Sequence, residues 1–324
     1  MPLFLAIEAG GTKTDFALAG PTEIIARART ESIKTLHVDA GTARERLEAG
    51  LTLIQAQSGV NLSQVAVTCV GAAGSQIPSV HAWLTVEIKR SVEGKLILVE
   101  DVEIALDAAF GVGKGVLVLA GTGSNVAGRC SDGNLVVHGG WGPALADYAS
   151  GHTLCQTALR KAFIALDEGH TSLFLTRVLQ KCNSNEMANL VEQANRASGT
   201  WFAELSPLLS ECAALGDKIS LRAIETETSI LARLARVAVT EVFGPLRPER
   251  NPRIAFAGSI MEHFNVVRES VENNIRRLVP DAAFSANIVS PIEGALFRAR
   301  AAFDLNCQHD DLATQASLRS TPAL

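Results

Sequence analysis

Two glycine turns that carry hydroxyl groups stand out, because each directly follows an apolar run. The first is Gly10-Gly11-Thr12-Lys13 after Leu3–Ile7, and the second is Gly121-Thr122-Gly123-Ser124-Asn125 after Val116–Leu119. Small residues let backbone N–H groups approach an anion, and Thr, Ser and Lys side chains add further donors. A single turn of this kind is also a common hairpin connection. Two turns at matching positions favour a pair of phosphate-binding turns that hold a polyphosphate from both sides.

Neither turn matches the common nucleotide-binding motifs. The P-loop pattern G-x-x-x-x-G-K-[ST] does not occur in the chain. The pattern G-x-G-x-x-G also fails, because Gly121 and Gly123 are followed by Gly128. The usual mononucleotide-binding and dinucleotide-binding folds are therefore not indicated.

Asp101 is the candidate general base. It follows the apolar run Leu96–Val99 and precedes the helical stretch Val102–Phe110. Its carboxylate is therefore expected at the carboxyl end of a strand, where α/β sheets present ligand sites. The alternative is that Asp101 caps the helix, since Asp is among the best N-cap residues. The other acids of this stretch are interpreted as solvent-exposed charges of the helix start: Glu100, Glu103 and Asp107.

A tryptophan flanked by glycines follows the second turn, in Gly139-Gly140-Trp141-Gly142. The Trp141 ring could present a flat apolar face to a sugar, with nearby backbone groups free to hydrogen-bond. The alternative is that Trp141 fills part of the core. Asp147, a few residues on, could bind a metal ion through water, hold a sugar hydroxyl or cap the next helix.

Gly258-Ser259 lies between the run Arg253–Ala257 and a helical stretch. A glycine at such a strand-to-helix turn leaves room for an adenine ring against the backbone. Packing alone can also require glycine there, so this motif gains weight only together with the others.

The elements that must position these residues follow an alternating pattern. Short apolar runs that end in Gly or an acid predict buried strands at Leu3–Ile7, Val65–Val70, Leu96–Val99, Val116–Leu119 and Ile254–Ala257. Stretches with helical spacing lie between them, such as Thr42–Gln57 and Glu262–Leu278. Alternating strands and helices predict an α/β fold.

Both glycine turns belong to a repeated unit of strand, Gly/Thr turn, strand, tight turn and strand. The repeat implies two similar lobes whose glycine turns face each other across a cleft. The three glycines of Gly111–Gly115 would suit a hinge between the lobes. We therefore predict an N-terminal lobe at 1–112, a C-terminal lobe at 113–306 with a helical insertion at about 150–244, and a mobile tail at 307–324.

The composition excludes several classes of protein. The chain has 324 residues, a net charge of −5, 47% hydrophobic and 5% aromatic residues, which is typical of a globular protein with about two domains. Scattered basic residues and few aromatics argue against nucleic acid as a partner. The chain shows no leader or membrane-spanning run, so we expect no membrane partner and a cytoplasmic location. The cysteines lie far apart and are expected to be reduced and mostly buried: Cys69, Cys130, Cys155, Cys182, Cys212 and Cys307.

The motifs taken together resemble the sugar-kinase, actin and Hsp70 superfamily, and more closely the N-acetylglucosamine kinase branch of the BadF/BadG/BcrA/BcrD ATPase family. In chain order the matches are Ala9–Asp15 for the first phosphate motif, Glu100-Asp101 for the strand-end aspartate, Leu119–Asn125 for the second phosphate motif, Gly139–Gly142 with Asp147 for the sugar segment, Ala257–Ser259 for the adenosine motif and Pro291–Ala295 for the closing helix. The resemblance implies two ribonuclease H-like, actin-like ATPase lobes around a nucleotide cleft. It also implies phosphorylation of an amino sugar by ATP and Mg²⁺, and relatives suggest a homodimer.

The resemblance also implies roles for single residues. Asp101 would accept the proton of the sugar hydroxyl that attacks the γ-phosphate. Nucleotide contacts are expected from Gly10, Gly11, Thr12, Lys13, Gly121, Thr122, Gly123, Ser124, Gly258 and Ser259. Sugar contacts are expected from Thr35, Asn125, Gly140, Trp141 and Asp147. The protein ligands of the metal ion are not indicated.

Some positions depart from the family pattern. The chain has Asp147-Tyr148-Ala149-Ser150 where the family commonly has Asp-Glu-Gly-Ser. The sugar-binding Asn expected after the third strand is replaced by Ser32–Leu36, in which Lys34 or Thr35 is nearest, and Ser75 stands where an acid is common. An ATP-dependent kinase of an amino sugar is therefore better supported than one particular sugar, although N-acetylglucosamine or glucosamine at the primary hydroxyl is the leading hypothesis.

Two other functions are compatible with the family. One is an ATPase that activates a partner enzyme through a subunit-bridging iron–sulfur cluster, and the scattered cysteines argue against it. The other is a nucleotide-binding or sugar-binding regulatory protein that has lost transfer activity. The presence of Asp101 argues against that, while Tyr148 and the missing sugar-binding Asn leave it open.

Overall fold

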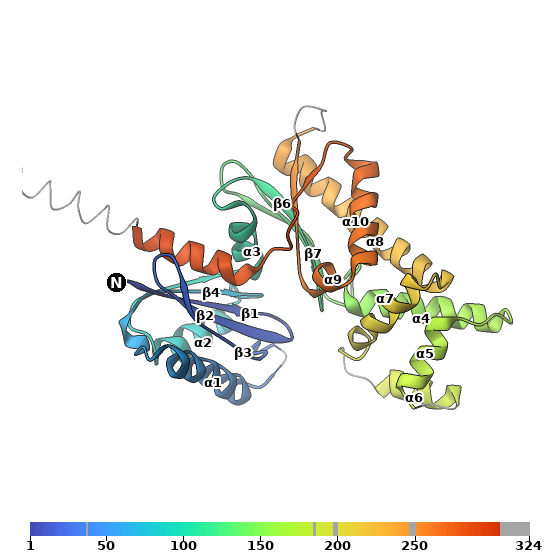
Figure 1. Ribbon diagram of the computed structural model, residues 1–324, viewed down its shortest axis with the longest axis horizontal. Coiled ribbons are helices and arrows are strands. Elements are labelled where there is room, and N and C mark those ends of the chain that lie inside the picture. The colour runs from blue at the N-terminus through green and yellow to red at the C-terminus, as the bar shows by residue number, and fades with distance from the viewer. Residues whose placement is uncertain (37, 184–185, 197–199, 246–250, 305–324) are drawn as a thin grey trace, which may run out of the picture. The chain divides into compact units, whose positions relative to one another are not determined.

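The computed structural model describes residues 1–36, 38–183, 186–196, 200–245 and 251–304 (Figure 1). The chain forms two compact units, one of Met1–Gly111 together with the segment from Ser290 onward, the other of Val112–Val289. The first boundary lies one residue before the one predicted from the sequence. The predicted tail 307–324, with Cys307, falls outside the described residues. Within the described ranges, no helix has both the length and the apolar character to cross a membrane.

The first unit is built on a five-stranded sheet of order β3-β2-β1-β4-β5. Its strands are β1 (Leu3–Ala9), β2 (Lys13–Ala19), β3 (Ile24–Glu31), β4 (Val65–Ala72) and β5 (Lys95–Val99). The strands β1, β2 and β3 form an antiparallel meander, and β4 and β5 continue the sheet in parallel with β1. The predicted strands at the N-terminus and at Val65–Val70 and Leu96–Val99 are confirmed.

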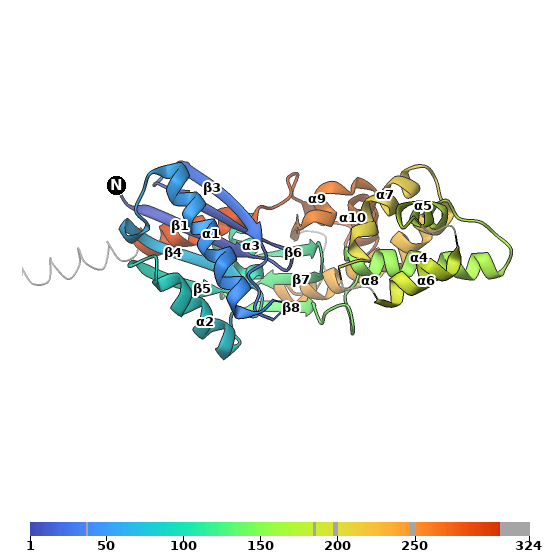
Figure 2. The ribbon, with the colours of Figure 1, turned by 90° about the horizontal axis from the view of Figure 1, so that it is seen from below.

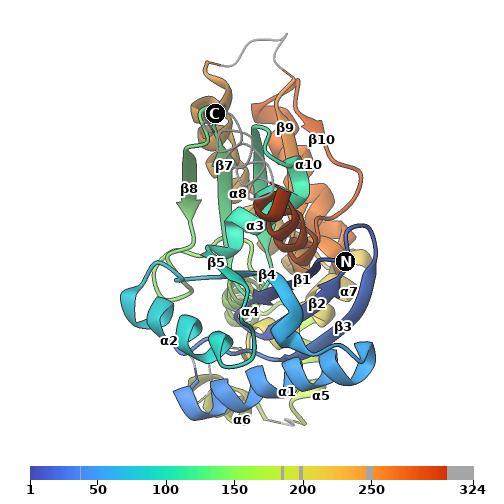
Figure 3. The same cartoon turned by 90° about the vertical axis from the view of Figure 1, so that its left-hand side faces the viewer.

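Helices cover both faces of this sheet. The helices α1 (Ala40–Ser58) and α2 (Pro78–Lys89) pack on one face, through a core that includes Leu47 and Leu84 (Figure 3). The short η1 (Leu62–Gln64) leads into β4. The other face carries α3 (Asp101–Phe110) and a C-terminal helix over residues 291–304.

The placement of the C-terminal helix corrects our prediction, which assigned residues up to 306 to the second lobe. Ile292 and Leu296 are buried against Phe4 and Val67 of the first sheet. This apolar face is worth roughly 2 kcal/mol for each large side chain that it buries, so the helix stabilises the first unit. The first unit is therefore made of two segments that are far apart in the sequence.

The second unit repeats the strand order of the first. Its strands are β6 (Gly115–Ala120), β7 (Ser124–Arg129), β8 (Leu135–Gly139), β9 (Arg253–Ala257) and β10 (Ala283–Phe284). Their order is β8-β7-β6-β9-β10, with an antiparallel meander followed by parallel β9 and β10, and β6, β7 and β8 lie side by side in Figure 2. The predicted repeat of strand, glycine turn, strand, tight turn and strand is confirmed, as is the α/β fold class.

The helical stretch predicted at about 150–244 corresponds to helices between β8 and β9: α4 (Gly151–Asp167), α5 (Leu173–Lys181), α6 (Met187–Arg196), η2 (Ala203–Leu205), α7 (Ser206–Ala214) and α8 (Lys218–Phe243). The long α8 packs on β6, β7 and β8 and also against α4. It therefore covers one face of the sheet of the second unit and also packs against another helix of the insertion.

The helix predicted over Glu262–Leu278 is split into α9 (Ser259–His263) and α10 (Asn265–Leu278). The break is at Phe264, whose backbone leaves the helical region at φ −117° and ψ 83°. Phe264 is partly buried and packs against the core of the second unit. Apolar spacing alone did not reveal the break, because it continues across both helices.

Candidate functional site

The first glycine turn joins β1 to β2 and is supported from behind by the segment after β3. The Gly10 N–H donates to the Lys13 carbonyl (3.0 Å), which closes the turn. The Ser32 N–H donates to the Thr12 carbonyl (3.1 Å), and the Ser32 hydroxyl donates to the Gly10 carbonyl (2.7 Å). Gly11, Thr12 and Lys13 are exposed. The phosphate contact predicted for this turn remains a prediction. The exposure of these three residues is compatible with it.

The segment that supports the turn also carries Thr35, the predicted sugar contact. The Ile33 N–H donates to the buried Thr14 hydroxyl (3.2 Å), and the Ile33 side chain is 1% exposed. Thr35 and the neighbouring Lys34 are half-buried. The structure therefore places Thr35 in the same unit as the first turn, and its contact with a sugar stays a prediction.

Acidic side chains gather at the start of this turn. Glu8 is the penultimate residue of β1 and lies opposite Asp15 of β2. Burial, followed by the charges of Asp15 and Asp101, raises the pKa of Glu8 from 4.5 to about 7, against the opposing effect of Lys13. Lys13, predicted to contact phosphate, forms an ion pair with Asp15 (3.2 Å) and stays about half exposed. Arg29 also donates to Asp15 (2.5 Å).

Glu8 was missed by the sequence analysis as a site residue. The available signal was a carboxylate near the end of a buried strand, with only Ala9 between it and the glycine turn. Parallel strands carry their ligand-facing residues at their carboxyl ends, so the position of Glu8 in the sequence is as typical of a site residue as that of Asp101.

Asp101 is the first residue of α3, at the carboxyl end of β5. The N-cap is Glu100, which forms a reciprocal capping box with Glu103. The alternative that Asp101 caps the helix is therefore wrong. One carboxylate oxygen of Asp101 accepts from the Val102 N–H (2.8 Å). Burial raises the pKa of Asp101 most, with a smaller rise from Glu100, while the Val102 amide and Lys34 act in the opposite direction.

The interpretation of Glu100, Glu103 and Asp107 as solvent-exposed charges is also wrong. Glu100 accepts hydrogen bonds from the backbone N–H groups of Gly74 (2.9 Å) and Gln76 (3.1 Å). Glu103 and Asp107 both accept from the Arg298 guanidinium of the C-terminal helix, at 2.9 and 2.5 Å. These acids hold the loop after β4 and the last helix around α3, and so fix the position of Asp101.

The second glycine turn joins β6 to β7 and is tied to the loop before α4. The Gly151 N–H donates to the Gly121 carbonyl (2.9 Å). Ser124 is buried, and both its N–H (2.6 Å) and its hydroxyl (2.8 Å) donate to the same Asp147 oxygen. Asp147 therefore anchors this turn, whereas the predicted nucleotide contacts of Thr122, Gly123 and Ser124 remain predictions.

Gly258 and Ser259 lie next to the second turn. A methyl group on Gly258 would lie 2.3 Å from the Ala120 carbonyl oxygen, and the Gly258 backbone has φ +95°. A methyl group on Gly121 would lie 3.4 Å from the Ser259 hydroxyl. The fold thus brings the predicted adenosine motif against the predicted phosphate turn, and only glycine fits at position 258.

The predicted sugar residues of the second unit also lie around this turn. A methyl group on Gly140 would lie 3.3 Å from the Asn125 Cβ. Trp141 is 70% exposed, so the alternative that it fills the core is wrong. In the described part of the chain, the buried Asn125 Oδ1 and Asp147 Oδ2 have no hydrogen-bond partner. Unpaired buried acceptors are rare in folded proteins, which marks both atoms as places where a ligand could donate.

The chain matches a known protein family over nearly its whole length. A model described as the BadF/BadG/BcrA/BcrD ATPase family matches residues 5–299. The chain belongs to this ATPase family. Its fold is that of the actin-like ATPases, in agreement with the resemblance found in the sequence.

Two similar proteins are kinases of amino sugars. The N-acetyl-D-glucosamine kinase of Dictyostelium discoideum is 26% identical over 311 residues, covering 90% of this chain and 96% of that protein. The N-acetylmuramic acid/N-acetylglucosamine kinase of Clostridium acetobutylicum is 24% identical over 318 residues, covering 90% and 99%. The crystal structure of a putative N-acetylglucosamine kinase from Chromobacterium violaceum matches with a TM-score of 0.72 at 23% identity, covering 91% and 98%. The structural match shows the shared fold.

One departure from the family pattern is now visible in space. Ala149, at the position where the pattern has glycine, is fully buried and keeps a left-handed backbone at φ +60°. Tyr148 before it is half-buried. Ala149 therefore adopts a left-handed backbone without being glycine, the residue that adopts it most readily.

Proposed function

We propose that this protein transfers the γ-phosphoryl group of ATP to a hydroxyl of an amino sugar, with N-acetylglucosamine or glucosamine phosphorylated at the 6-position. The observation that carries the proposal is the carboxylate of Asp101. It stands at a strand end and at the first turn of α3, while Glu100 fills the capping role that would otherwise account for an acid there. Membership of an ATPase family and amino-sugar kinases among the relatives agree with it.

Asp101 serves as the general base in this proposal. A base is most effective when its pKa lies near the working pH, and burial moves the pKa of Asp101 upward in that direction. The carboxylate accepts the proton of the sugar hydroxyl while that oxygen bonds to the γ-phosphorus. The bond between the γ-phosphorus and the bridging oxygen breaks, and ADP leaves. The enzyme contributes mainly by positioning and electrostatics.

The glycine turns supply the nucleotide contacts. Their backbone N–H groups and the hydroxyls of Thr12 and Thr122 would hold the phosphates, and Gly258 and Ser259 would leave room for the adenosine. Mg²⁺, when bound with ATP, offsets the negative charge of the phosphates. The carboxylate of Glu8 fits such an ion: burial is the main cause of its raised pKa, followed by repulsion from Asp15 and Asp101, and a nearby cation would favour its charged form. Glu8 is thus the side chain that would face the ion, directly or through water, while Asp15 is already paired with Lys13 and Arg29.

The sugar contacts come from the second unit and from Thr35 of the first. Asn125 Oδ1 and Asp147 Oδ2 are acceptors without partners among the described residues, so they suit the hydroxyl and amide N–H donors of an amino sugar. The exposed Trp141 ring suits the apolar face of a pyranose. Closure about Gly111–Gly115, which would exclude water as a competing acceptor, and a homodimer are further parts of the proposal.

The test is release of ADP by the purified protein with ATP and Mg²⁺. The panel of acceptors is N-acetylglucosamine, glucosamine, glucose, N-acetylmannosamine and anhydro-muramic sugars. Release that one amino sugar stimulates, with the sugar phosphate seen by mass spectrometry, establishes the activity and its substrate. Slow release that no sugar stimulates would contradict the kinase and favour the partner-activating ATPase or the regulatory protein.

A further inference from the structure

A buried carboxylate in the middle of α8 is not used by the proposed mechanism. Glu227 is 7% exposed, and both of its carboxylate oxygens accept hydrogen bonds. One accepts from the Ala149 N–H (3.3 Å) and the other from the Thr157 hydroxyl (2.6 Å). Burying a carboxylate is costly unless such partners compensate it. Neither solubility nor helix formation explains why a carboxylate is buried at position 227.

The partner of Glu227 has an unusual backbone. Three residues other than glycine have positive φ in the described part of the chain, and two of them are the asparagines Asn183 and Asn251. Asparagine tolerates this conformation, whereas alanine loses about 1–2 kcal/mol in it. Ala149 has no side-chain polar group of its own to compensate. The surrounding structure must hold it there, and the Glu227 carboxylate receives its N–H.

Both flanks of Ala149 are fixed to the second glycine turn. On one side, Asp147 accepts the two hydrogen bonds from Ser124. On the other side, the Gly151 N–H donates to the Gly121 carbonyl. A change of φ at Ala149 rotates one flank relative to the other, so both contacts cannot survive it. The conformation of Ala149 therefore decides where Asp147 stands against the turn.

We propose that Glu227 is a positioning residue of the sugar site. By holding Ala149 in the left-handed conformation, it keeps the free Oδ2 of Asp147 aimed at the substrate. This inference rests on the proposed function, in which Asp147 contacts the sugar. Glu227 itself touches neither the sugar nor the nucleotide in the proposal.

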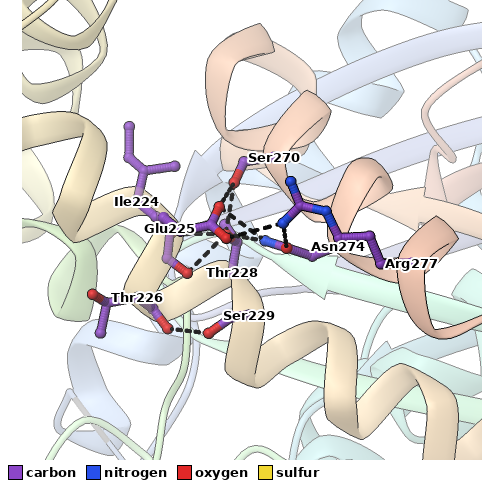
Figure 4. A network of polar contacts seen from close by, with 8 residues as sticks. All are labelled: Ile224, Glu225, Thr226, Thr228, Ser229, Ser270, Asn274 and Arg277. Carbon is purple, nitrogen blue, oxygen red and sulfur yellow. Dashed lines mark hydrogen bonds and ion pairs between the residues drawn. The ribbon is translucent and has the colours of Figure 1, made fainter.

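The same helix offers a matched control. Glu225 lies two residues earlier in α8 and turns to α10, as Figure 4 shows. It accepts from Asn274 (3.2 Å), Ser270 (3.3 Å) and Arg277 (3.3 Å). This network fastens α8 to α10, and among the described residues its hydrogen bonds include none to the loop around Ala149. A substitution at Glu225 therefore removes a carboxylate from the same helix without disturbing Asp147.

The kinetic test compares Glu227→Gln with Glu225→Gln. Glutamine has one oxygen in place of two, and its remaining hydrogen bond from the Ala149 N–H no longer goes to a charged acceptor. We expect Glu227→Gln to raise the KM for the sugar by about tenfold while the KM for ATP changes by less than about twofold. Glu225→Gln should leave both constants within about twofold. Equal effects of the two substitutions on the sugar KM would overturn the proposal.

A second substitution tests the route through Ala149. Glycine adopts positive φ without the penalty that alanine meets. Adding Ala149→Gly to Glu227→Gln should therefore return the sugar KM to within about threefold of the parent. If the double variant stays as impaired as Glu227→Gln alone, Glu227 does not act by holding this backbone.

A measurement without catalysis separates this inference from the proposed function. Amide hydrogen exchange reports whether the N–H groups of Ser124 and Gly151 keep their acceptors. Exchange at both should accelerate by about tenfold or more in Glu227→Gln, but not in Glu225→Gln, and it should recover in the double variant. This pattern supports the positioning role even if no sugar is phosphorylated. Unchanged exchange in Glu227→Gln overturns it even if the protein proves to be a kinase.

Discussion

The turn between β1 and β2 and the turn between β6 and β7 occupy the same place in two sheets of the same strand order. The first stands among charged groups, with Glu8 and Asp15 beside it and Lys13 within it. The second is anchored by one carboxylate, Asp147, which Ser124 engages, and by close backbone packing at Gly258. The repeated strands thus give both turns the same position in their sheets. The first turn differs in its charged neighbours, and the second in its hydrogen bonds to Asp147 and its tight packing.

The two turns are also supported alike. Ser32 donates to the Gly10 carbonyl in the first unit, and Gly151 donates to the Gly121 carbonyl in the second. Each support comes from a segment that follows the third strand of its meander. The predictions below test whether the first turn depends on charge and the second on fit.

The largest effect is expected from the charged unit. Asp101→Asn removes the proposed proton acceptor and should lower kcat by about 10²–10⁴-fold, with the Kd for ATP within about twofold of the parent. Single-turnover transfer and nucleotide titration measure the two quantities. Asp39→Asn is the control, because Asp39 caps α1 on the surface and asparagine caps equally well. Near-normal turnover of Asp101→Asn would show that the base is another group.

Close fit at the second turn predicts a loss of stability. Gly258→Ala places a methyl group against the Ala120 carbonyl in a backbone that alanine rarely adopts, and should lower the free energy of unfolding by roughly 2–4 kcal/mol. Gly133→Ala has a similar φ of +87° with open space around it, so it should lose only about 1 kcal/mol. Denaturant unfolding of both variants measures the two losses of stability. Equal losses would mean that backbone strain, and not the close approach, dominates at Gly258.

The buried carboxylate of Glu8, beside the first turn, predicts a pH dependence of stability. The pKa of Glu8 is about 7 in the folded protein, compared with 4.5 for an unperturbed glutamate in the unfolded chain. Between these two pH values the folded state therefore binds the proton of Glu8 more tightly than the unfolded state does. The contribution of Glu8 to stability is therefore greatest below about pH 4.5 and declines as the pH rises to about 7. Glu8→Gln should remove this decline and make the protein more stable at about pH 8, by at most about 3 kcal/mol.

Urea unfolding at several pH values measures this difference. Parallel pH profiles for the parent and Glu8→Gln would show that neither burial nor the neighbouring charges raise the pKa of Glu8 in the folded protein. In that case the contrast between the two turns would lie only in their contacts.

The smallest effect is expected from the exposed ring of the second unit. Trp141→Ala should raise the KM for the sugar by about tenfold and the KM for ATP by less than about twofold. Steady-state kinetics with each substrate varied gives both values. Leu215→Ala, at a similarly exposed apolar side chain, should change neither. If Trp141→Ala weakens both substrates equally, the ring supports the turn instead of the sugar.

Much of the fold could be predicted because its signals are local. The apolar runs, the glycine turns and the alternation of strands and helices lie within a few residues of one another. The C-terminal helix could not be assigned to its unit in this way. Its partners are distant in the sequence, as with Arg298 and Asp107, which are 191 residues apart. Apolar spacing shows that a helix has a buried face and does not show which sheet covers that face.

The site was predictable to a similar depth. Asp101 was found from its place after a strand, but the choice of N-cap between two adjacent acids depends on one pair of backbone angles. Glu100 has the extended conformation of a cap, at φ −67° and ψ 150°, and Asp101 already belongs to the helix. Nothing in the local sequence separates these cases. The roles of Glu8 and Glu227 depend on neighbours that only the folded chain supplies.

The return of residues 291–304 to the first unit has a consequence for biosynthesis. The second unit, Val112–Val289, is one uninterrupted segment, so it can fold as soon as it has been translated. The sheet face that contains Phe4, Val67 and Cys69 receives its last cover only afterwards. During that interval a nascent first unit presents an apolar surface of the kind that chaperones bind and that promotes aggregation. The order of translation thus makes the unit that begins the chain the last one to be completed.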